Sequence, residues 1–156
     1  MLAKNKTVVA ELRSALDLPD IFDKIANSEK LPLQLDIQCQ ATSLFFKYSS
    51  ELGRFKDDIK NYIPLWETNG ESVVAFDQNR EVFVHLYYED ISEYHLGKTY
   101  QQFISSILTT IYESGALFEE LTEISELFGF KHLEALMIFC EDENGCLEEF
   151  NNRLPD

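Results

Sequence analysis

The chain has 156 residues, which is enough for one domain with a sizeable core, and 45% of them are apolar and 13% aromatic. This composition excludes intrinsic disorder, and the net charge of −15 disfavours direct binding to nucleic acid or to anionic membranes. We therefore expect an ordered, soluble protein.

The cellular location of the protein is predicted from its apolar segments and its cysteines. The sequence has no run of 18 apolar residues and no apolar signal segment after Met1. Its three cysteines, Cys39, Cys140 and Cys146, have spacings typical of neither a zinc site nor a redox motif. Three reduced thiols in the cytoplasm are the expectation.

The negative charge is concentrated toward the C-terminal part of the chain. Residues 1–60 carry nine basic and nine acidic side chains, residues 61–112 sum to −5, and residues 113–156 sum to −10. Such a surface accelerates encounter with basic partners, although solubility alone is an equally acceptable explanation.

The N-terminal part predicts two helices. Apolar residues of the stretch 4–16 recur at helical spacing, and Pro19 follows soon after it. Residues 20–28 repeat the pattern before a break at Pro32.

The middle of the chain predicts an antiparallel meander of four or five strands. Alternating apolar residues favour a strand over 33–40, and a second apolar run over 44–48 can pair with it. Gly53 and its charged neighbours are expected to form a connection. The remaining strands are expected at residues 62–66, 73–76 and 82–88, of which the first two are joined through Asn69-Gly70, a strong hairpin signal.

The C-terminal part returns to helical periodicity. One helix is predicted over residues 99–114 with Thr99 as its N-cap, and another over 116–127. Residues 132–139 form either a helix or a strand, and an acidic turn and a polar tail follow. The predicted fold class is α+β: a mostly antiparallel four- to five-stranded sheet with N-terminal and C-terminal helices packed around it, in a single domain 1–156 with an acidic helical extension from about 114.

No motif indicates catalysis. No nucleophile has a base at a recognisable spacing, and the acidic surroundings of Cys140 and Cys146 oppose thiolate formation. His85 and His95 lie ten residues apart without a zinc pattern, and residues 141–145 lack the alternating ligands of a calcium loop. We expect no catalytic residues, no metal and no cofactor, and a protein that is not an enzyme.

Aromatic residues are frequent in the predicted sheet. Because neighbouring residues of a strand face opposite sides, Tyr87 and Tyr88 cannot both lie under the same layer. Tryptophan and tyrosine are enriched at the centres of protein interfaces. One face of the sheet is therefore a candidate binding surface, unless helices cover both faces.

The stretch from Tyr62 to Asp77, with Pro64-Leu65 and the Asn69-Gly70 turn, continues through a strand to Asp90 and a helix over 100–108 that presents Phe103. These features resemble the SUKH superfamily (Smi/Knr type), and the segment 16–22 resembles the leucine-proline helix entry of that family. The resemblance covers about residues 16–110. It implies an α+β fold and, commonly, a bacterial immunity protein that neutralises a cognate toxin, often a basic nuclease.

The hypothesis from the sequence is inhibition by occlusion of a toxin with a basic surface, without contact to nucleic acid or membrane. The aromatic residues would anchor the toxin and the carboxylates around them would supply charge; the predicted contact residues are Trp66, Glu67, Glu71, Asp77, Tyr87 and Tyr88. The alternatives are a regulatory or scaffold module that binds an endogenous protein or small ligand, and contacts through the glutamates of the helix over 116–127.

Overall fold

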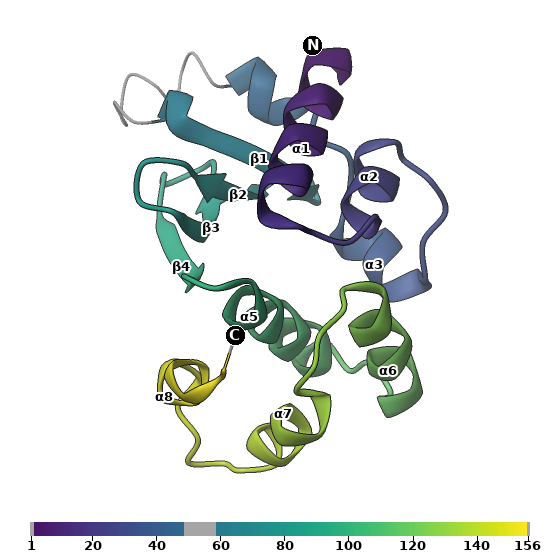
Figure 1. Cartoon of the computed structure of the whole chain (residues 1–156), viewed down its shortest axis with the longest axis vertical. Helices are drawn as coiled ribbons and strands as arrows, with labels where there is room; N and C mark the ends of the chain where they lie inside the picture. The colour runs from purple at the N-terminus through teal and green to yellow at the C-terminus, as the bar shows by residue number, and fades with distance from the viewer. Residues whose placement is uncertain (1, 49–58, 156) are drawn as a thin grey trace. The chain divides into compact units, whose positions relative to one another are not determined.

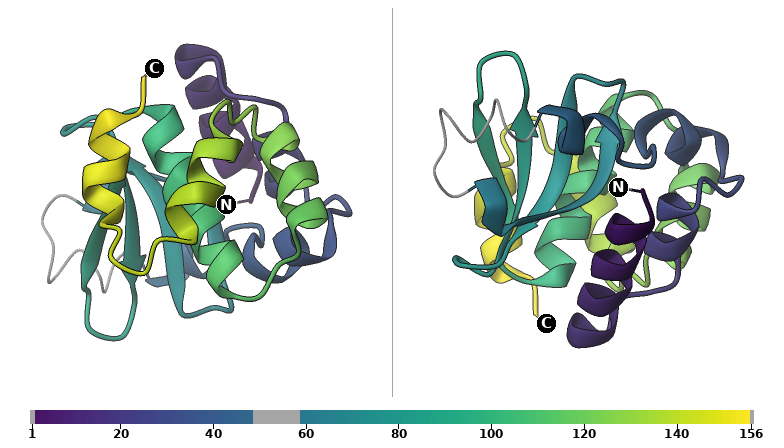
Figure 2. Two further views of the ribbon diagram at one scale, coloured as in Figure 1. Left: turned by 90° about the horizontal axis from the view of Figure 1, so that it is seen from below. Right: turned by 90° about the horizontal axis from the view of Figure 1, so that it is seen from above.

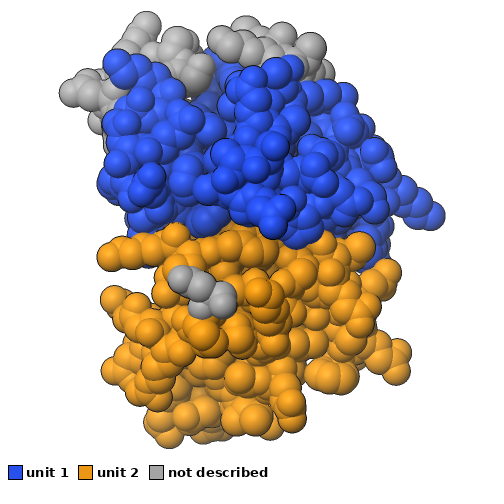
Figure 3. All heavy atoms as spheres, in the orientation of Figure 1, with its two compact units in different colours: residues 1–95 blue, residues 96–156 orange. Residues whose placement is uncertain are grey.

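A computed structural model describes residues 2–48 and 59–155, and the side chains from residue 6 onward within these ranges. The expected connection around Gly53 lies outside the described residues. The chain divides into two compact units, residues 1–95 and residues 96–156 (Figure 3). The fold class is α+β, as predicted, with helices flanking one antiparallel sheet.

The first unit begins with helices α1 (Leu2–Leu16) and α2 (Ile21–Ala26), which confirm both predicted N-terminal helices. Together with α3 (Leu33–Gln38), they pack against strand β1 (Tyr62–Thr68) (Figure 1). The Phe22 ring of α2 lies 6.0 Å from the Trp66 ring of β1, measured between centroids.

The strand predicted over 33–40 is wrong, because these residues form α3. Every second residue is apolar, a pattern that also contains the i, i+4 spacing of a helix. The helix buries Leu35 and Cys39, four residues apart, and leaves Leu33 and Ile37 exposed. Pro32 directly precedes the first turn, where a missing N–H costs nothing.

The strand predicted over 44–48 is also wrong, since these residues are helical. Thr42 and Ser43, both of types that commonly cap helices, directly precede this helix. The backbone N–H groups of Ser43 and Phe45 donate to the carboxylate of Glu67, more than twenty residues away. A long-range acceptor thus satisfies N–H groups at the start of this helix.

The predicted meander is confirmed over its central part. Strand β1 pairs antiparallel with β2 (Ser72–Asp77), and β2 pairs antiparallel with β3 (Val82–Tyr87), in a sheet ordered β1-β2-β3-β4. Asn69 and Gly70 both have positive φ, the conformation that a type I′ hairpin turn requires. The fourth strand, β4 (Glu93–Gly97), runs across the boundary between the units and was not predicted.

Strand alternation gives the sheet two different faces. One face buries apolar residues of β2 and β3 against Ile59 of the short 3₁₀-helix η1 (Ile59–Asn61) and against the helical residues 44–48; these strand residues are Val73, Ala75, Val82, Val84 and Leu86. The opposite face carries Val74 and Trp66, which lie beside each other in the register, and Phe83, His85 and Tyr87 of β3.

The second unit is built around helix α5 (Tyr100–Glu113), which contacts α6 (Phe118–Leu127), α7 (Leu133–Cys140) and α8 (Leu147–Arg153) (Figure 2). The predicted N-cap is confirmed: Thr99 accepts the Gln102 N–H at 3.3 Å, and the Gln102 side chain accepts the Thr99 N–H in return. Residues 133–140 are helical, which resolves the choice left open by the sequence.

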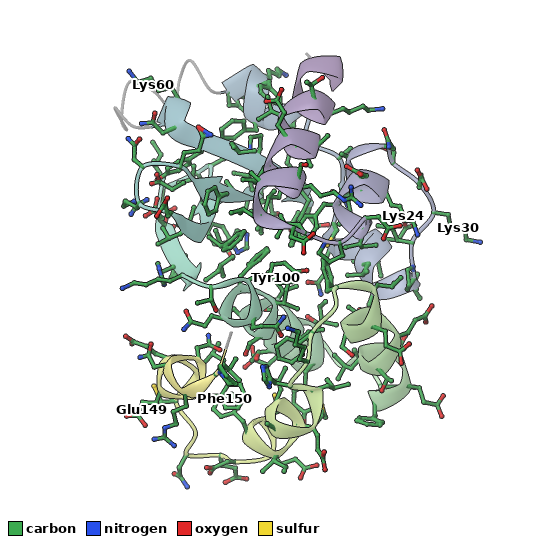
Figure 4. All side chains as sticks on the ribbon, viewed as in Figure 1. Lys24, Lys30, Lys60, Tyr100, Glu149 and Phe150 are labelled. Atoms are coloured by element: carbon green, nitrogen blue, oxygen red, sulfur yellow. The ribbon has the colours of Figure 1, made fainter. Side chains whose placement is uncertain are left out.

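The polar tail expected after residue 145 is instead mostly the helix α8. The Phe150 ring stacks on Phe139 of α7 at 4.8 Å, and in Figure 4 it points toward α7 whereas Glu149 points outward. Asn151 is buried and donates to the Ser106 hydroxyl of α5 at 3.1 Å. Two anchoring residues in a polar segment therefore hold this helix against the unit.

Candidate functional site

The most exposed aromatic cluster of the sheet is formed by Tyr87 and Tyr94, supported by His85; we call these three residues the tyrosine patch. The Tyr87 and Tyr94 rings meet edge to face with centroids 5.7 Å apart, and the His85 ring lies 4.6 Å from Tyr87. Tyr87 is 37% exposed and Tyr94 is 59% exposed. The patch offers a broad aromatic surface with two hydroxyl groups.

Strand geometry explains why the patch is accessible. His85 and Tyr87 are two residues apart in β3, so both point to the face opposite Val84 and Leu86. Burial along this side of β3 decreases from Phe83, which is 2% exposed, through His85 to Tyr87 at the strand end. The end of the strand therefore presents its aromatic residue to solvent.

A hydrogen bond beneath the patch fixes the His85 ring. Its Nε2 atom lies 2.8 Å from the Ser72 hydroxyl of the neighbouring strand. Burial lowers the pKa of His85, which favours the neutral imidazole. Although this distance suits a nucleophile and its base, Ser72 is only 2% exposed, so its hydroxyl cannot reach a substrate in this conformation. The hydrogen bond between Ser72 and His85 therefore fixes the ring that packs against Tyr87.

Carboxylates rim the same end of the sheet. The β1–β2 turn carries Glu71 and the β3–β4 turn carries Glu89 and Asp90, all exposed. The two turns are joined, because the Tyr88 N–H donates to the Glu71 carbonyl at 3.0 Å. Asp90 accepts from both the backbone and the hydroxyl of Ser92, and these bonds lower its pKa. The rim is thus negatively charged around an aromatic centre.

Of the six predicted contact residues, Trp66 lies in the core. It is 2% exposed and packs on Phe22. Its side chain cannot touch a partner in this conformation, and its role here is to join α2 to the sheet.

Glu67 and Tyr88 are brought together, but inside the unit. Glu67 is 3% exposed, and one of its carboxylate oxygens accepts from Ser43 N–H, from Phe45 N–H at 2.6 Å and from the Tyr88 hydroxyl at 3.2 Å. Burial, together with the nearby Glu67 charge, raises the pKa of Tyr88, so its hydroxyl stays protonated as a donor. This network fixes the helical residues 44–48 on the sheet.

Asp77 is fully buried in a second internal network. Its carboxylate accepts from the backbone of Asn79 and from the guanidinium of Arg80. Arg80 also pairs with Glu93 at 2.7 Å, and Tyr62 donates to the same Glu93 carboxylate. The hydrogen bond to Glu93 is the main reason that the pKa of Arg80 is raised. Asp77 therefore holds the β2–β3 turn and is not available as surface charge.

The structure leaves Glu71 and Tyr87 exposed among the predicted residues and adds Tyr94. Tyr94 was missed because the segment 89–97 contains few apolar residues and was not assigned to a strand. The available signal was an aromatic residue in an otherwise polar stretch shortly after a turn.

The described residues contain no group of three His, Cys, Asp or Glu side chains placed to hold a metal ion. Among the same residues, no helix combines the length and the apolar character needed to cross a membrane. Comparison of the chain with family models, curated proteins and solved structures gave no match.

Proposed function

We propose that this chain is a binding protein whose tyrosine patch docks a basic surface of another protein. The observation that carries the proposal is the paired Tyr87 and Tyr94 rings, accessible and backed by a fixed histidine, within a rim of carboxylates. Tyrosine gives a large contact area at a low entropic cost, because only two side-chain torsions are immobilised.

The partner class follows from the charge. The first unit carries ten basic and sixteen acidic residues, and the second carries three basic and twelve acidic ones. Complementary potential steers a basic partner toward the chain and disfavours acidic competitors. Glu71, Glu89 and Asp90 would then act at the rim, where charges mainly affect the association rate.

The resemblance to the SUKH superfamily suggests what the binding achieves. Within this proposal the chain is an immunity protein that covers the basic cleft of a cognate toxin, such as a nuclease, and blocks access of its substrate. It acts in the cytoplasm, an assignment supported by three free cysteines, of which Cys146 is exposed.

The test uses the proteins encoded on either side of this chain's own gene. Each is expressed in a bacterial host with and without the chain, and growth and complex formation are measured. The proposal expects one neighbour to arrest growth, the chain to restore it, and the two proteins to elute together in size-exclusion chromatography. If neither neighbour is toxic and neither binds, the immunity proposal is overturned; binding without toxicity would instead support a regulatory or scaffold module.

Surface variants then locate the contact. Tyr87→Ala and Tyr94→Ala are expected to weaken the complex, since both remove exposed ring area. Phe118→Ala is the matched control, because Phe118 in the second unit is as exposed as Tyr94, at 59%. If the control and the tyrosine variants lose the same affinity for the partner, the tyrosine patch is not the contact surface.

A further inference from the structure

The second unit contains a cavity of about 340 Å³ that the tyrosine patch does not involve. The last turns of α5, the end of α7, the loop before α8 and the first residue of α8 line it, and it is open to solvent on one side; we call it the acidic pocket. Its walls combine hydroxyl, thiol, carboxylate and aromatic groups, with Thr109, Glu113, Phe139, Cys140, Glu143 and Leu147 among them.

The polar side of the pocket is negative. Glu113, Asp142 and Glu143 contribute carboxylates, and none of the described residues that line it is basic. Within the part of the chain that the structure describes, no lysine or arginine forms an ion pair with these three groups. Burial is the main cause that raises the pKa of Cys140, and the charge of Glu113 adds to it, so this thiol stays protonated.

The backbone adds to the negative potential independently of the side chains. Helix α5 ends at Glu113 and α7 ends at Cys140, and both ends border the pocket. The C-terminal end of a helix carries partial negative charge, which a basic residue in the last turn usually offsets. Neither of these helices has such a residue. Two helix ends without a basic residue in the last turn therefore border the same cavity, and backbone N–H groups of the residues that follow cap several of their carbonyls.

The other wall is aromatic and rigid. The Phe139 ring is held by its stack on Phe150 at 4.8 Å. It also packs closely on Gly145, where an added Cβ would lie 2.6 Å from the ring. Phe139 thus offers a fixed surface for an alkyl chain or for a cation, and Leu147 extends the apolar side.

Together, the negative side and the aromatic side of the pocket favour a ligand with an apolar stem and a positively charged end. Negative potential excludes anions, and the described residues offer no three-ligand metal site. We propose that the acidic pocket binds an alkylguanidinium or alkylammonium group, as found in arginine and lysine side chains and in free polyamines. This inference does not depend on the proposed toxin partner.

The experiment is a titration of the whole chain followed by backbone amide NMR. Agmatine represents a free alkylguanidinium, a capped Gly-Arg-Gly peptide represents an arginine side chain, and pentanoate is an anionic control. Saturable shifts at the amides of Thr110 and Gly145 are expected with the cations and not with pentanoate. If both cations bind, side chains of proteins fit; if only agmatine binds, the source is a free amine. Absence of saturable shifts with both cations overturns the proposal.

Matched variants separate the pocket from the general acidity of the chain. Glu113→Gln with Glu143→Gln removes two charges at the pocket, and Glu119→Gln with Glu123→Gln removes two exposed charges on α6. The pocket variant should weaken agmatine binding by about tenfold, because charge-assisted contacts are lost. All four residues are exposed, but Glu119 and Glu123 do not line the pocket, so the α6 variant should change agmatine binding by less than about twofold, since charges away from the ligand are screened. Equal weakening by both variants would show that the cation responds only to net charge, and would overturn the site.

The thiol gives a second readout in a Cys146→Ser background, where Cys140 is the more accessible of the two remaining cysteines. At a ligand concentration of about ten times Kd, alkylation of Cys140 by iodoacetamide should slow by about tenfold, because only the empty pocket reacts. An unchanged alkylation rate under saturating agmatine would place the ligand outside the pocket and contradict the inference.

Discussion

The carboxylates of the sheet and those of the second unit have opposite surroundings, although both are aspartate and glutamate in acidic stretches of sequence. Glu67 and Asp77 are buried, and each accepts several hydrogen bonds from its own unit. Glu113 and Glu143 instead line a cavity whose described walls contain no basic residue. Charge therefore stabilises structure in the sheet, whereas in the second unit it is exposed to solvent at the cavity.

The aromatic residues show the same division. Trp66 and Tyr87 were both predicted as anchors, but Trp66 packs on Phe22 in the core and Tyr87 lies on the surface. Burial decides whether a side chain stabilises the fold or can contact a partner. The burial of a single residue cannot be read from the sequence. The following predictions test this division, from the largest expected effect to the smallest.

Replacing Trp66 with alanine should cause the largest loss of stability, about 4 kcal/mol of unfolding free energy, because it removes a buried ring and leaves a cavity. Urea unfolding followed by circular dichroism measures this. Tyr94→Ala is the control and should cost no more than about 0.5 kcal/mol, as expected for a surface position. Similar losses for both variants would show that exposure does not separate the two classes of aromatic residue.

Glu67→Ala should lower the unfolding free energy by about 3 kcal/mol, since the buried Phe45 N–H, the part-buried Ser43 N–H and the Tyr88 hydroxyl lose their acceptor. Glu67→Gln keeps one carbonyl oxygen and should cost about 1 kcal/mol. The same urea measurement applies. A Glu67→Ala protein as stable as the wild type would contradict the role of this carboxylate as the cap of residues 44–48.

Thr99→Ala should cost about 1 kcal/mol, because the Gln102 N–H at the start of α5 loses its acceptor. Thr122 provides the control, since its hydroxyl only donates back to the Phe118 carbonyl within the helix. Thermal unfolding should show a clear decrease in Tm for Thr99→Ala and little change for Thr122→Ala. The reverse order would rule out the capping box as a source of stability.

The smallest effect concerns pH and His85. Because burial lowers the folded-state pKa of His85, the unfolded chain binds a proton at higher pH than the folded chain. The stabilisation by neutral His85 is complete above the ordinary histidine pKa of about 6.5 and is lost as pH falls toward the folded pKa. Urea titrations between pH 8 and pH 5 should show a smaller decrease in stability for His85→Gln than for the wild type. If the unfolding free energies of the two proteins decrease equally with pH, the proposed coupling between His85 protonation and stability is wrong.

The parts of the fold that depend on local signals were predictable. The Asn69-Gly70 hairpin, the strands around it and the Thr99 cap follow from turn chemistry and periodicity. The helix over residues 44–48 was not predicted, because its apolar run also suits a strand and the Glu67 carboxylate that accepts two of its N–H groups is distant in sequence. The alternation over 33–40 fits a strand better than a helix, yet these residues form α3, in which only Leu35 and Cys39 of the apolar set are buried and Leu33 and Ile37 are exposed.

The candidate site was predictable only in part. The sequence placed Glu71 and Tyr87 near one hairpin, where the structure leaves both exposed. It could not separate them from Trp66 and Glu67, since the burial of these residues depends on distant partners such as Phe22 and Phe45, nor from Asp77, whose partner Arg80 lies only three residues away. The acidic pocket was not foreseen, because its walls come from three helices and a turn of the second unit.

The most direct test of the tyrosine patch compares two variants in binding and in stability. The affinity for the neighbouring gene product that binds the chain is measured by calorimetry, and urea unfolding is measured on the same samples. Tyr87→Ala with Tyr94→Ala should weaken binding by about a hundredfold and leave the unfolding free energy within about 1 kcal/mol of the wild type. Trp66→Phe should do the opposite, lowering stability without changing affinity. Wild-type affinity in the double tyrosine variant would contradict the account.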